Sequence, residues 1–302
     1  MAPLAMKIIR FGTAIGERIA PDLTGWCAFW MFCRTPKPDL SSPGQARAME
    51  RAAELMAKSA FRQLEAGGKQ IAAYEFQPHQ NDTARGTVLV LHGWNSRTEH
   101  MIGVIGAMRD LGFRVVALDL PGLGRSSGRS LSLASAVEAC HTADKELGPF
   151  DAIVGHSLGG AVAINAVAGT MRDVPSVRVR RLVTISAPNA LSDLFKMVGE
   201  RLGLGPASQA GLEAAVERVG GNPLETYVNA NLLRQVGVPT LVIHDRGDKE
   251  VPPADAEALA SAGRDVEILW TEKLGHRRIL NDQSVLDNAV AFLSKIRLSR
   301  AA

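Results

Sequence analysis

Short, continuous apolar runs recur through most of this chain, and segments of helical length separate them. The runs occupy residues 88–91, 115–118, 152–154, 182–185, 241–243 and 266–269. Continuous rather than alternating apolar character is typical of strands buried on both faces, as in a parallel sheet covered by helices. Helix-length segments lie at about residues 100–111, 133–147, 158–171, 254–262 and 284–296. This alternation predicts one doubly wound α/β domain.

Two segments before this series have a different character. Residues 61–64 and 71–76 are separated by Ala66-Gly67-Gly68, a spacing that favours an antiparallel hairpin. Together with the six buried runs, the hairpin predicts a mostly parallel eight-stranded sheet flanked by helices. Loops at the carboxyl ends of the parallel strands are where we expect an active site.

Residues 1–58 precede this pattern, and we interpret them as an N-terminal helical arm. The apolar positions of 6–19 predict an amphipathic helix, and 46–60 predict another helix. Residues 26–32 concentrate aromatic side chains in a chain that has few of them. The preferred interpretation is an arm packed on the main domain or across a dimer. The alternative is an interfacial anchor that makes peripheral membrane contact.

Residues 189–236 form an interval too long for an ordinary connection. Apolar spacing near 191–198 and 212–219 predicts two amphipathic helices. Because the interval directly follows a strand, it would fold over the carboxyl edge of the sheet as a small helical cap that shapes the substrate pocket. The alternative is one crossover helix with a long loop. The predicted core is therefore 59–188 and 237–302.

Composition narrows the class of protein. The 302 residues are 46% hydrophobic and 22% charged, as in an ordinary globular protein. The net charge of +3 and scattered arginines argue against a nucleic-acid partner. Three cysteines, Cys27, Cys33 and Cys140, have no zinc spacing and suit a reducing compartment. With no secretory signal or membrane span in the pattern, we expect a cytoplasmic protein, with peripheral membrane attachment through the arm left open.

The strongest chemical motif is Gly155-His156-Ser157-Leu158-Gly159, between an apolar run and a segment of small, helix-forming residues. Strand, sharp turn and helix are the context of a nucleophile elbow, in which a serine is held in a strained turn with its hydroxyl exposed. The glycines are expected where a Cβ would collide with the neighbouring strand or helix. We therefore predict that Ser157 is a nucleophile.

A second loop supplies the expected oxyanion hole. Leu91-His92-Gly93-Trp94 ends the first strand of the parallel series. In elbow enzymes this loop and the residue after the nucleophile each contribute one backbone N–H. The predicted donors are therefore Trp94 and Leu158. We expect His92 to tie the loop by hydrogen bonds rather than to act as a base.

The expected acid and base follow the serine in the chain. Three carboxylates, Asp245, Asp248 and Glu250, follow the strand at 241–243. Asp248 is preferred because it lies in the turn beyond the strand, whereas Asp245 is expected to brace the loop; both alternatives stay open. His276, after the last strand and before the last helix, is the predicted base.

Because of these motifs, residues from about 61 to 296 resemble the α/β-hydrolase superfamily, specifically its esterase, lipase and acyl-aminopeptidase-like members with a small cap. The chain order Ser157, Asp248, His276 is that of the superfamily's triad. The segment Asp119–Ser126 is similar to its Asp-x-Pro-Gly-x-Gly-x-Ser turn, and Asp248–Pro252 to its acid strand. The absence of a Gly-Gly run after His92 departs from the hormone-sensitive-lipase-like branch.

The resemblance implies a serine hydrolase that cleaves a carboxylic ester through an acyl-enzyme, without metal or organic cofactor. The apolar cap favours a small-molecule ester with an apolar or lipid-like acyl group. The same triad also serves acyltransferases, lyases and carbon–carbon bond hydrolases. A non-catalytic binding protein with this fold is the less favoured alternative.

Overall fold

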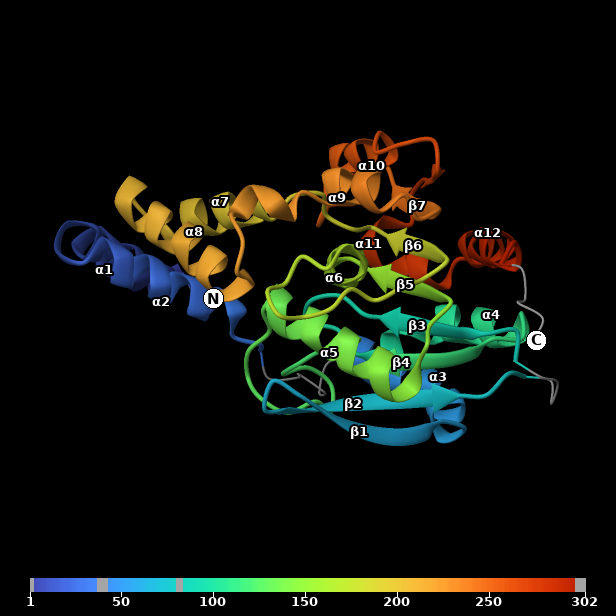
Figure 1. Cartoon of the computed structure of the whole chain (residues 1–302). Helices are drawn as coiled ribbons and strands as arrows, with labels where there is room; N and C mark the ends of the chain where they lie inside the picture. Colours follow the sequence, from blue (N-terminus) through green and yellow to red (C-terminus); the bar gives the residue numbers. More distant parts are fainter. Residues whose placement is uncertain (1–2, 37–42, 80–83, 297–302) are drawn as a thin grey trace.

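The computed structural model describes residues 3–36, 43–79 and 84–296 (Figure 1). Within them, one eight-stranded sheet has the order β1-β2-β4-β3-β5-β6-β7-β8. Its strands are β1 (Ala60–Ala66), β2 (Lys69–Phe76), β3 (Thr87–Leu91), β4 (Arg114–Leu118), β5 (Ala152–His156), β6 (Arg181–Ile185), β7 (Thr240–Asp245) and β8 (Val266–Thr271). Strand β2 is antiparallel to β1 and β4, and the other pairs are parallel. The predicted mostly parallel sheet is confirmed.

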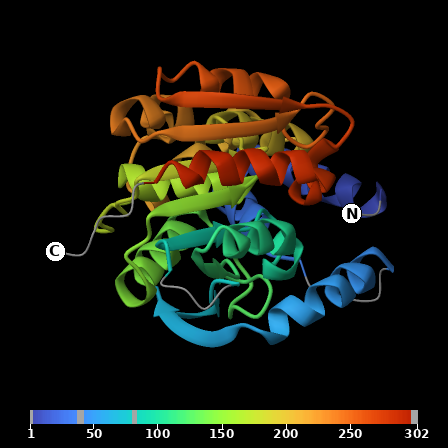
Figure 2. The ribbon, with the colours of Figure 1, turned by 90° about the vertical axis from the view of Figure 1, so that its right-hand side faces the viewer.

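Helices cover both faces of the sheet. One face carries α3 (Pro43–Ala57), the 3-10 helix η1 (Thr98–Met101), α4 (Ile102–Asp110) and α12 (Gln283–Ser294). The other carries α5 (Leu133–Leu147), α6 (Leu158–Ala168), α9 (Asn229–Val236) and α10 (Pro253–Ala260). Figure 2 shows the sheet from β1 at the bottom to β8 at the top.

The central strands are buried on both sides because alternate residues enter two different cores. In β3, Val88 and Val90 pack in the core below α4 and α12, while Leu89 and Leu91 pack in the core below α5 and α6. All five residues of β3 are buried, and so are all five of β5. This explains why the sequence shows continuous apolar runs rather than alternation.

The interval after β6 forms α7 (Leu191–Leu202), α8 (Pro206–Gly220), the 3-10 helix η2 (Leu224–Tyr227) and α9. Helices α7 and α8 leave the sheet and pack with α1 (Pro3–Ile19) and α2 (Pro21–Cys33), forming what we call the helical lobe (α1, α2, α7 and α8; Figure 1). Helix α9 instead packs on α6 and α10. The end of the predicted cap therefore joins the helical layer of the core.

Close backbone approach joins α2 to α8. A Cβ on Gly25 would lie 2.2 Å from Leu212 N, and one on Gly211 would lie 2.9 Å from Asp22 Cα. The side chain of Glu17 accepts hydrogen bonds from the N–H groups of Ala207 and Ser208, at the N-terminus of α8 (2.9 and 2.8 Å). A carboxylate is favoured there because it complements the free N–H groups and the helix dipole. These contacts fix the arm against the cap helices.

The residues interpreted as one arm divide between two places. Helices α1 and α2 belong to the helical lobe, whereas α3 packs against η1 and α4 on the body of the protein. Residues 1–2 and 37–42 of the predicted arm, and 80–83 and 297–302 of the predicted core, lie outside the described residues. Among the described residues, no helix combines the length and apolar character needed to cross a membrane.

Candidate active site

Ser157 lies between β5 and α6 in a strained backbone conformation. Its φ of 53° and ψ of −124° fall in a region that side-chain-bearing residues rarely occupy. The turn is closed by tight contacts: a Cβ on Gly155 would lie 2.3 Å from Gly159 O, and one on Gly159 would lie 2.4 Å from Leu91 O. Only glycine fits at either position, so the sequence motif has the steric basis expected of an elbow.

The loop after β3 lies directly against this turn. A Cβ on Gly93 would be 2.9 Å from Ser157 Cβ, so the glycine allows the loop to approach the serine. Neither Trp94 N–H nor Leu158 N–H donates a hydrogen bond to another group within the described part of the chain. Leu158 is also the first residue of α6, where N–H groups have no helical partner. Two free donors therefore flank the serine.

Buried hydrogen bonds hold the Trp94 loop in place. His92 accepts from Leu120 N–H at Nε2 (2.9 Å), so its proton is on Nδ1, which donates to Gly93 O (2.8 Å). Burial lowers the pKa of His92 and keeps the ring neutral. Both ring nitrogens are thus occupied by backbone groups, which leaves His92 no free nitrogen for proton transfer.

The segment resembling the Asp-x-Pro-Gly-x-Gly-x-Ser turn braces this loop from below. Asp119 is fully buried, and its carboxylate accepts hydrogen bonds from Thr98 N–H, Arg125 N–H and the Tyr74 hydroxyl. A Cβ on Gly124, which has a φ of 53°, would overlap that carboxylate. The turn therefore supports the Trp94 loop.

Asp248 and His276 form a buried pair at the carboxyl ends of β7 and β8. His276 Nδ1–H donates to Asp248 Oδ2 (2.8 Å), and Asp248 Oδ1 accepts from the N–H groups of Glu250 and Val251 (2.8 and 3.1 Å). Burial alone would raise the pKa of Asp248, but these hydrogen bonds outweigh it and hold the pKa at about 2. Asp248 is therefore ionised and fixes the His276 tautomer with Nε2 free to accept a proton.

The other two carboxylates occupy different positions. Asp245 Oδ2 accepts from Thr271 Oγ1–H and Leu274 N–H, and its Oδ1 accepts from Gly247 N–H (2.8 to 2.9 Å). Asp245 therefore braces the loops that carry the buried pair. Glu250 is half exposed and approaches the opposite ring nitrogen of His276, with Oε2 3.8 Å from Nε2. That position cannot orient the ring through Nδ1.

His156 contributes a contact that the sequence analysis missed. His156 Nε2–H donates to the backbone carbonyl oxygen of His276 (2.8 Å), and the two rings lie 4.7 Å apart. Burial, with a smaller contribution from His276, lowers the pKa of His156 to about 3. A neutral His156 thus ties the His276 segment to the elbow. His276 itself lies in a short helix, α11 (Gly275–Arg278), rather than in the loop expected from sequence.

Ser157 follows His156 in the chain, but its side chain makes no hydrogen bond to His276 within the described part of the structure. Among the described residues, no hydrogen bond joins Ser157 Oγ to His276 Nε2. Catalytic hydrogen bonds of this kind are often long in the free enzyme and shorten when substrate is bound. The structure thus brings Asp248 and His276 together and places His276 beside the elbow through His156.

Aromatic side chains of the helical lobe contact the Trp94 loop. Phe32 of α2 stacks on Trp94, with ring centroids 5.3 Å apart and an interplanar angle of 11°. Phe32 also meets Phe195 of α7 edge-on at 5.3 Å. The aromatic run at residues 26–32 is visible in the sequence, but the sequence does not predict its contact with Trp94. The lobe therefore contacts the loop that lies against the elbow.

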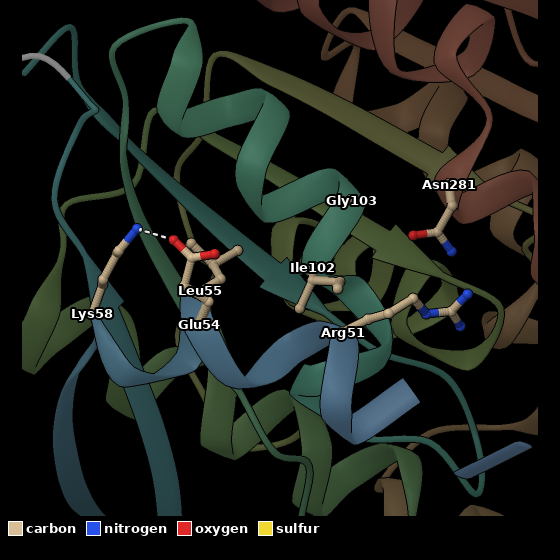
Figure 3. A pocket seen from close by; sticks show the side chains of 7 residues that line it. All are labelled: Arg51, Glu54, Leu55, Lys58, Ile102, Gly103 and Asn281. Carbon is tan, nitrogen blue, oxygen red and sulfur yellow. Dashed lines mark hydrogen bonds and ion pairs between the residues drawn. The ribbon is translucent and has the colours of Figure 1, made fainter. Parts of the chain in front are cut away.

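A shallow pocket of about 270 Å³ lies elsewhere, between α3 and α4 (Figure 3). Arg51 and Glu54 of α3 line it together with Lys58, which follows that helix, and Glu54 forms an ion pair with Lys58. None of the predicted site residues lines this pocket. In the part of the chain that the structure describes, no cluster of three or more His, Cys, Asp or Glu residues is arranged to hold a metal ion.

Known proteins resemble this chain in sequence or in fold. The rat putative protein-lysine deacylase ABHD14B is 37% identical over 65 residues, a match that spans 21% of this chain and 31% of the relative. The structure of Est1E from Butyrivibrio proteoclasticus with bound ferulic acid has a TM-score of 0.63 at 18% identity, over 78% of this chain and 100% of that one. Carboxylesterase CesB from Bacillus subtilis has a TM-score of 0.59 at 20% identity, over 82% and 96%.

Such structural likeness at low identity supports the fold alone, but the sequence itself also matches a family. The model of the alpha/beta hydrolase family matches residues 88–288, which include the elbow, the Trp94 loop and the Asp248–His276 pair. The chain therefore belongs to the α/β-hydrolase family.

Proposed function

We propose that the protein is a serine hydrolase that cleaves a carboxylic ester through Ser157, His276 and Asp248. The observation that carries this proposal is the conjunction at one sheet edge of a strained Ser157 and a buried Asp248–His276 pair tied to it by His156. A strained serine and an ionised carboxylate on a histidine are the elements that nucleophilic catalysis requires.

In the proposed mechanism, Ser157 Oγ attacks the ester carbonyl carbon and His276 Nε2 takes its proton. The oxyanion accepts hydrogen bonds from the N–H groups of Trp94 and Leu158, the latter favoured further by the N-terminus of α6. Asp248 holds the imidazole in orientation and stabilises its charged form. The C–O bond then breaks, and the alcohol leaves with the proton from His276.

The acyl-enzyme is resolved by the same groups. His276 takes a proton from water, which attacks the acyl carbon, and the acid leaves as Ser157 regains its proton. The low pKa of His156 supports this cycle, because a neutral neighbour does not compete with His276 for the proton. Each free N–H in the oxyanion hole would contribute on the order of 3 kcal/mol to the transition state.

The aromatic cluster supports an apolar acyl group. Phe32 stacks on Trp94, and Phe195 packs on Phe32, so an acyl chain leaving the oxyanion site toward the lobe would meet aromatic rings. Other apolar residues of α7 are weaker support, because Val198 and Leu202 are buried within the lobe by packing. We therefore propose that the substrate is an ester with an apolar chain.

Hydrolysis of p-nitrophenyl esters of graded chain length tests the proposal. We expect wild-type protein to release p-nitrophenol with a preference for medium or long chains, and Ser157→Ala to fall to the background rate. Ser261→Ala, at an exposed serine directly after α10, is the matched control and should keep full activity. Equal rates for wild type and Ser157→Ala would contradict the proposed nucleophile.

Amide deacylation is the second candidate, favoured by the partial match to a putative protein-lysine deacylase. The same acyl-enzyme would form from an acyl-lysine, with the amine as leaving group. Acyl transfer, lyase and carbon–carbon hydrolysis also remain open to this triad. To distinguish these reactions, an acyl-lysine peptide and an added alcohol acceptor are compared with the esters under the same conditions, and the products formed are identified.

A further inference from the structure

Helix α1 exposes a continuous apolar stripe. Five large side chains recur at intervals of three or four residues and are largely open to solvent: Leu4 (70% exposed), Ile8 (63%), Phe11 (69%), Ile15 (44%) and Ile19 (78%). At 3.6 residues per turn they fall within an arc of about 80°, along a helix about 25 Å long. A soluble helix normally turns such a stripe toward the core, whereas this face has no partner among the residues that the structure describes.

The orientation of α1 is fixed by its opposite face. Thr13 Oγ1 donates to Leu202 O (3.0 Å), and Glu17 accepts from the N-terminus of α8. Ile9 packs against the core, and a Cβ on Gly16 would overlap Thr24 Oγ1. The polar face of α1, which in a surface helix usually faces solvent, packs here against the rest of the lobe. The apolar stripe therefore cannot turn inward without breaking these contacts.

The charges beside the stripe are all positive. Lys7 and Arg18 are exposed and lie along one edge of the arc, and Arg10 reaches the carbonyl of Glu200. The helix carries one carboxylate, Glu17, and it is engaged with α8 on the far side. An approaching surface therefore meets apolar side chains bordered by cations.

We propose that α1 docks the protein on an anionic phospholipid surface, lying in the plane of the headgroups with its apolar stripe inserted. Apolar insertion and attraction of flanking cations to anionic lipid are the two contributions that hold such helices on membranes. A second copy of this chain is a poorer occupant of the stripe, because its own α1 would bring the same cations to the interface, and the one carboxylate of that helix, Glu17, is engaged with α8.

Docking through α1 would also orient the site. A single residue, Ala20, separates α1 from α2, and α2 carries Phe32 onto Trp94. The docking helix and the oxyanion loop therefore belong to one packed unit, with the lobe at the carboxyl side of the sheet (Figure 1). The inference extends the proposed function by adding a lipid surface, and it does not depend on the chemistry at Ser157.

Vesicle flotation tests the proposal. The vesicles contain either phosphatidylcholine alone or equal amounts of phosphatidylcholine and phosphatidylglycerol. We expect the full-length protein to float with the mixed vesicles and much less with phosphatidylcholine. Phe11→Gln and Ile8→Gln should each weaken binding about tenfold, the loss expected when one large side chain no longer inserts. Lys7→Gln and Arg18→Gln should reduce the difference between the two vesicle types.

Phe61→Gln is the matched control, because Phe61 is an exposed aromatic residue on β1, outside the lobe, and should bind as wild type does. Thermal unfolding of every variant checks that the exposed substitutions leave the fold intact. Ser157→Ala protein should float normally, which separates docking from catalysis.

Two results would overturn the proposal. One is equal flotation of wild type, Phe11→Gln and Phe61→Gln, which would place any lipid contact elsewhere. The other is a protein that does not float but forms a dimer by light scattering, with Phe11→Gln monomeric; the stripe would then join two copies.

Discussion

Replacing Asp248 with asparagine separates the proposed triad from its alternatives. Asp248 is buried, ionised and hydrogen-bonded to His276 Nδ1 at 2.8 Å. An amide in its place removes the charge that stabilises the imidazolium and can donate to Nδ1, which leaves the proton on Nε2 where it cannot accept from Ser157. We expect kcat/KM for p-nitrophenyl esters to fall by about 10³- to 10⁴-fold.

The same substitution should cost stability, by an amount that follows from the pKa. A shift from 3.8 to about 2 corresponds to about 2 kcal/mol at neutral pH. Because the folded-state pKa is depressed, this stabilisation is present above the unfolded-state value of about 3.9 and is lost as the pH falls toward about 2. Urea unfolding at neutral pH and at low pH should therefore show a gap between wild type and Asp248→Asn that closes in acid.

Asp245→Asn and Glu250→Gln are the controls. Asp245→Asn removes a loop brace, so it should lower the free energy of unfolding with a much smaller loss of kcat/KM. Glu250→Gln, at a half-exposed position, should change both quantities little. If Asp245→Asn abolished activity while Asp248→Asn retained it, the assignment of the acid would be refuted.

Two other substitutions probe the elbow and the lobe. Gly159→Ala forces a Cβ to within 2.4 Å of Leu91 O, so we expect unfolding midpoints in urea to drop sharply, whereas Gly106→Ala, in open space within α4, should stabilise by about 0.5–1 kcal/mol. Phe32→Ala removes the ring stacked on Trp94; it should lower kcat/KM for long-chain esters more than for acetate, and equal losses on both would contradict a role of the lobe in binding the acyl chain.

The sheet could be predicted from sequence because local patterns specify it. Strand β3 is apolar throughout and enters two cores, which continuous apolar runs indicate. Gly155 and Gly159 could also be interpreted, because the elbow motif requires them on steric grounds: a Cβ on Gly155 would meet Gly159 in the same turn, and one on Gly159 would meet Leu91 of the neighbouring strand. Ser157, Asp248 and His276 each follow a predicted strand of the parallel series. Because the carboxyl ends of parallel strands lie at the same edge of a sheet, the sequence predicts all three residues at that edge.

Contacts between segments distant in sequence were not accessible in this way. The bond from His156 to the carbonyl of His276 spans 120 positions and depends on the backbone path of α11. The stack of Phe32 on Trp94 depends on α2 crossing α8 at Gly25, a packing arrangement that periodicity does not encode. The sequence pattern predicts a single arm over residues 1–58, but helix packing separates α1 and α2 from α3.

Labelling with a fluorophosphonate, followed by mass spectrometry of the peptides, shows whether Ser157 is the nucleophile. Only a serine activated by a neighbouring base reacts rapidly with such a reagent. We expect one adduct, on Ser157, that is absent in Ser157→Ala and forms much more slowly in Asp248→Asn. A wild-type protein that stays unlabelled, or an adduct on another serine that persists in Ser157→Ala, would contradict it.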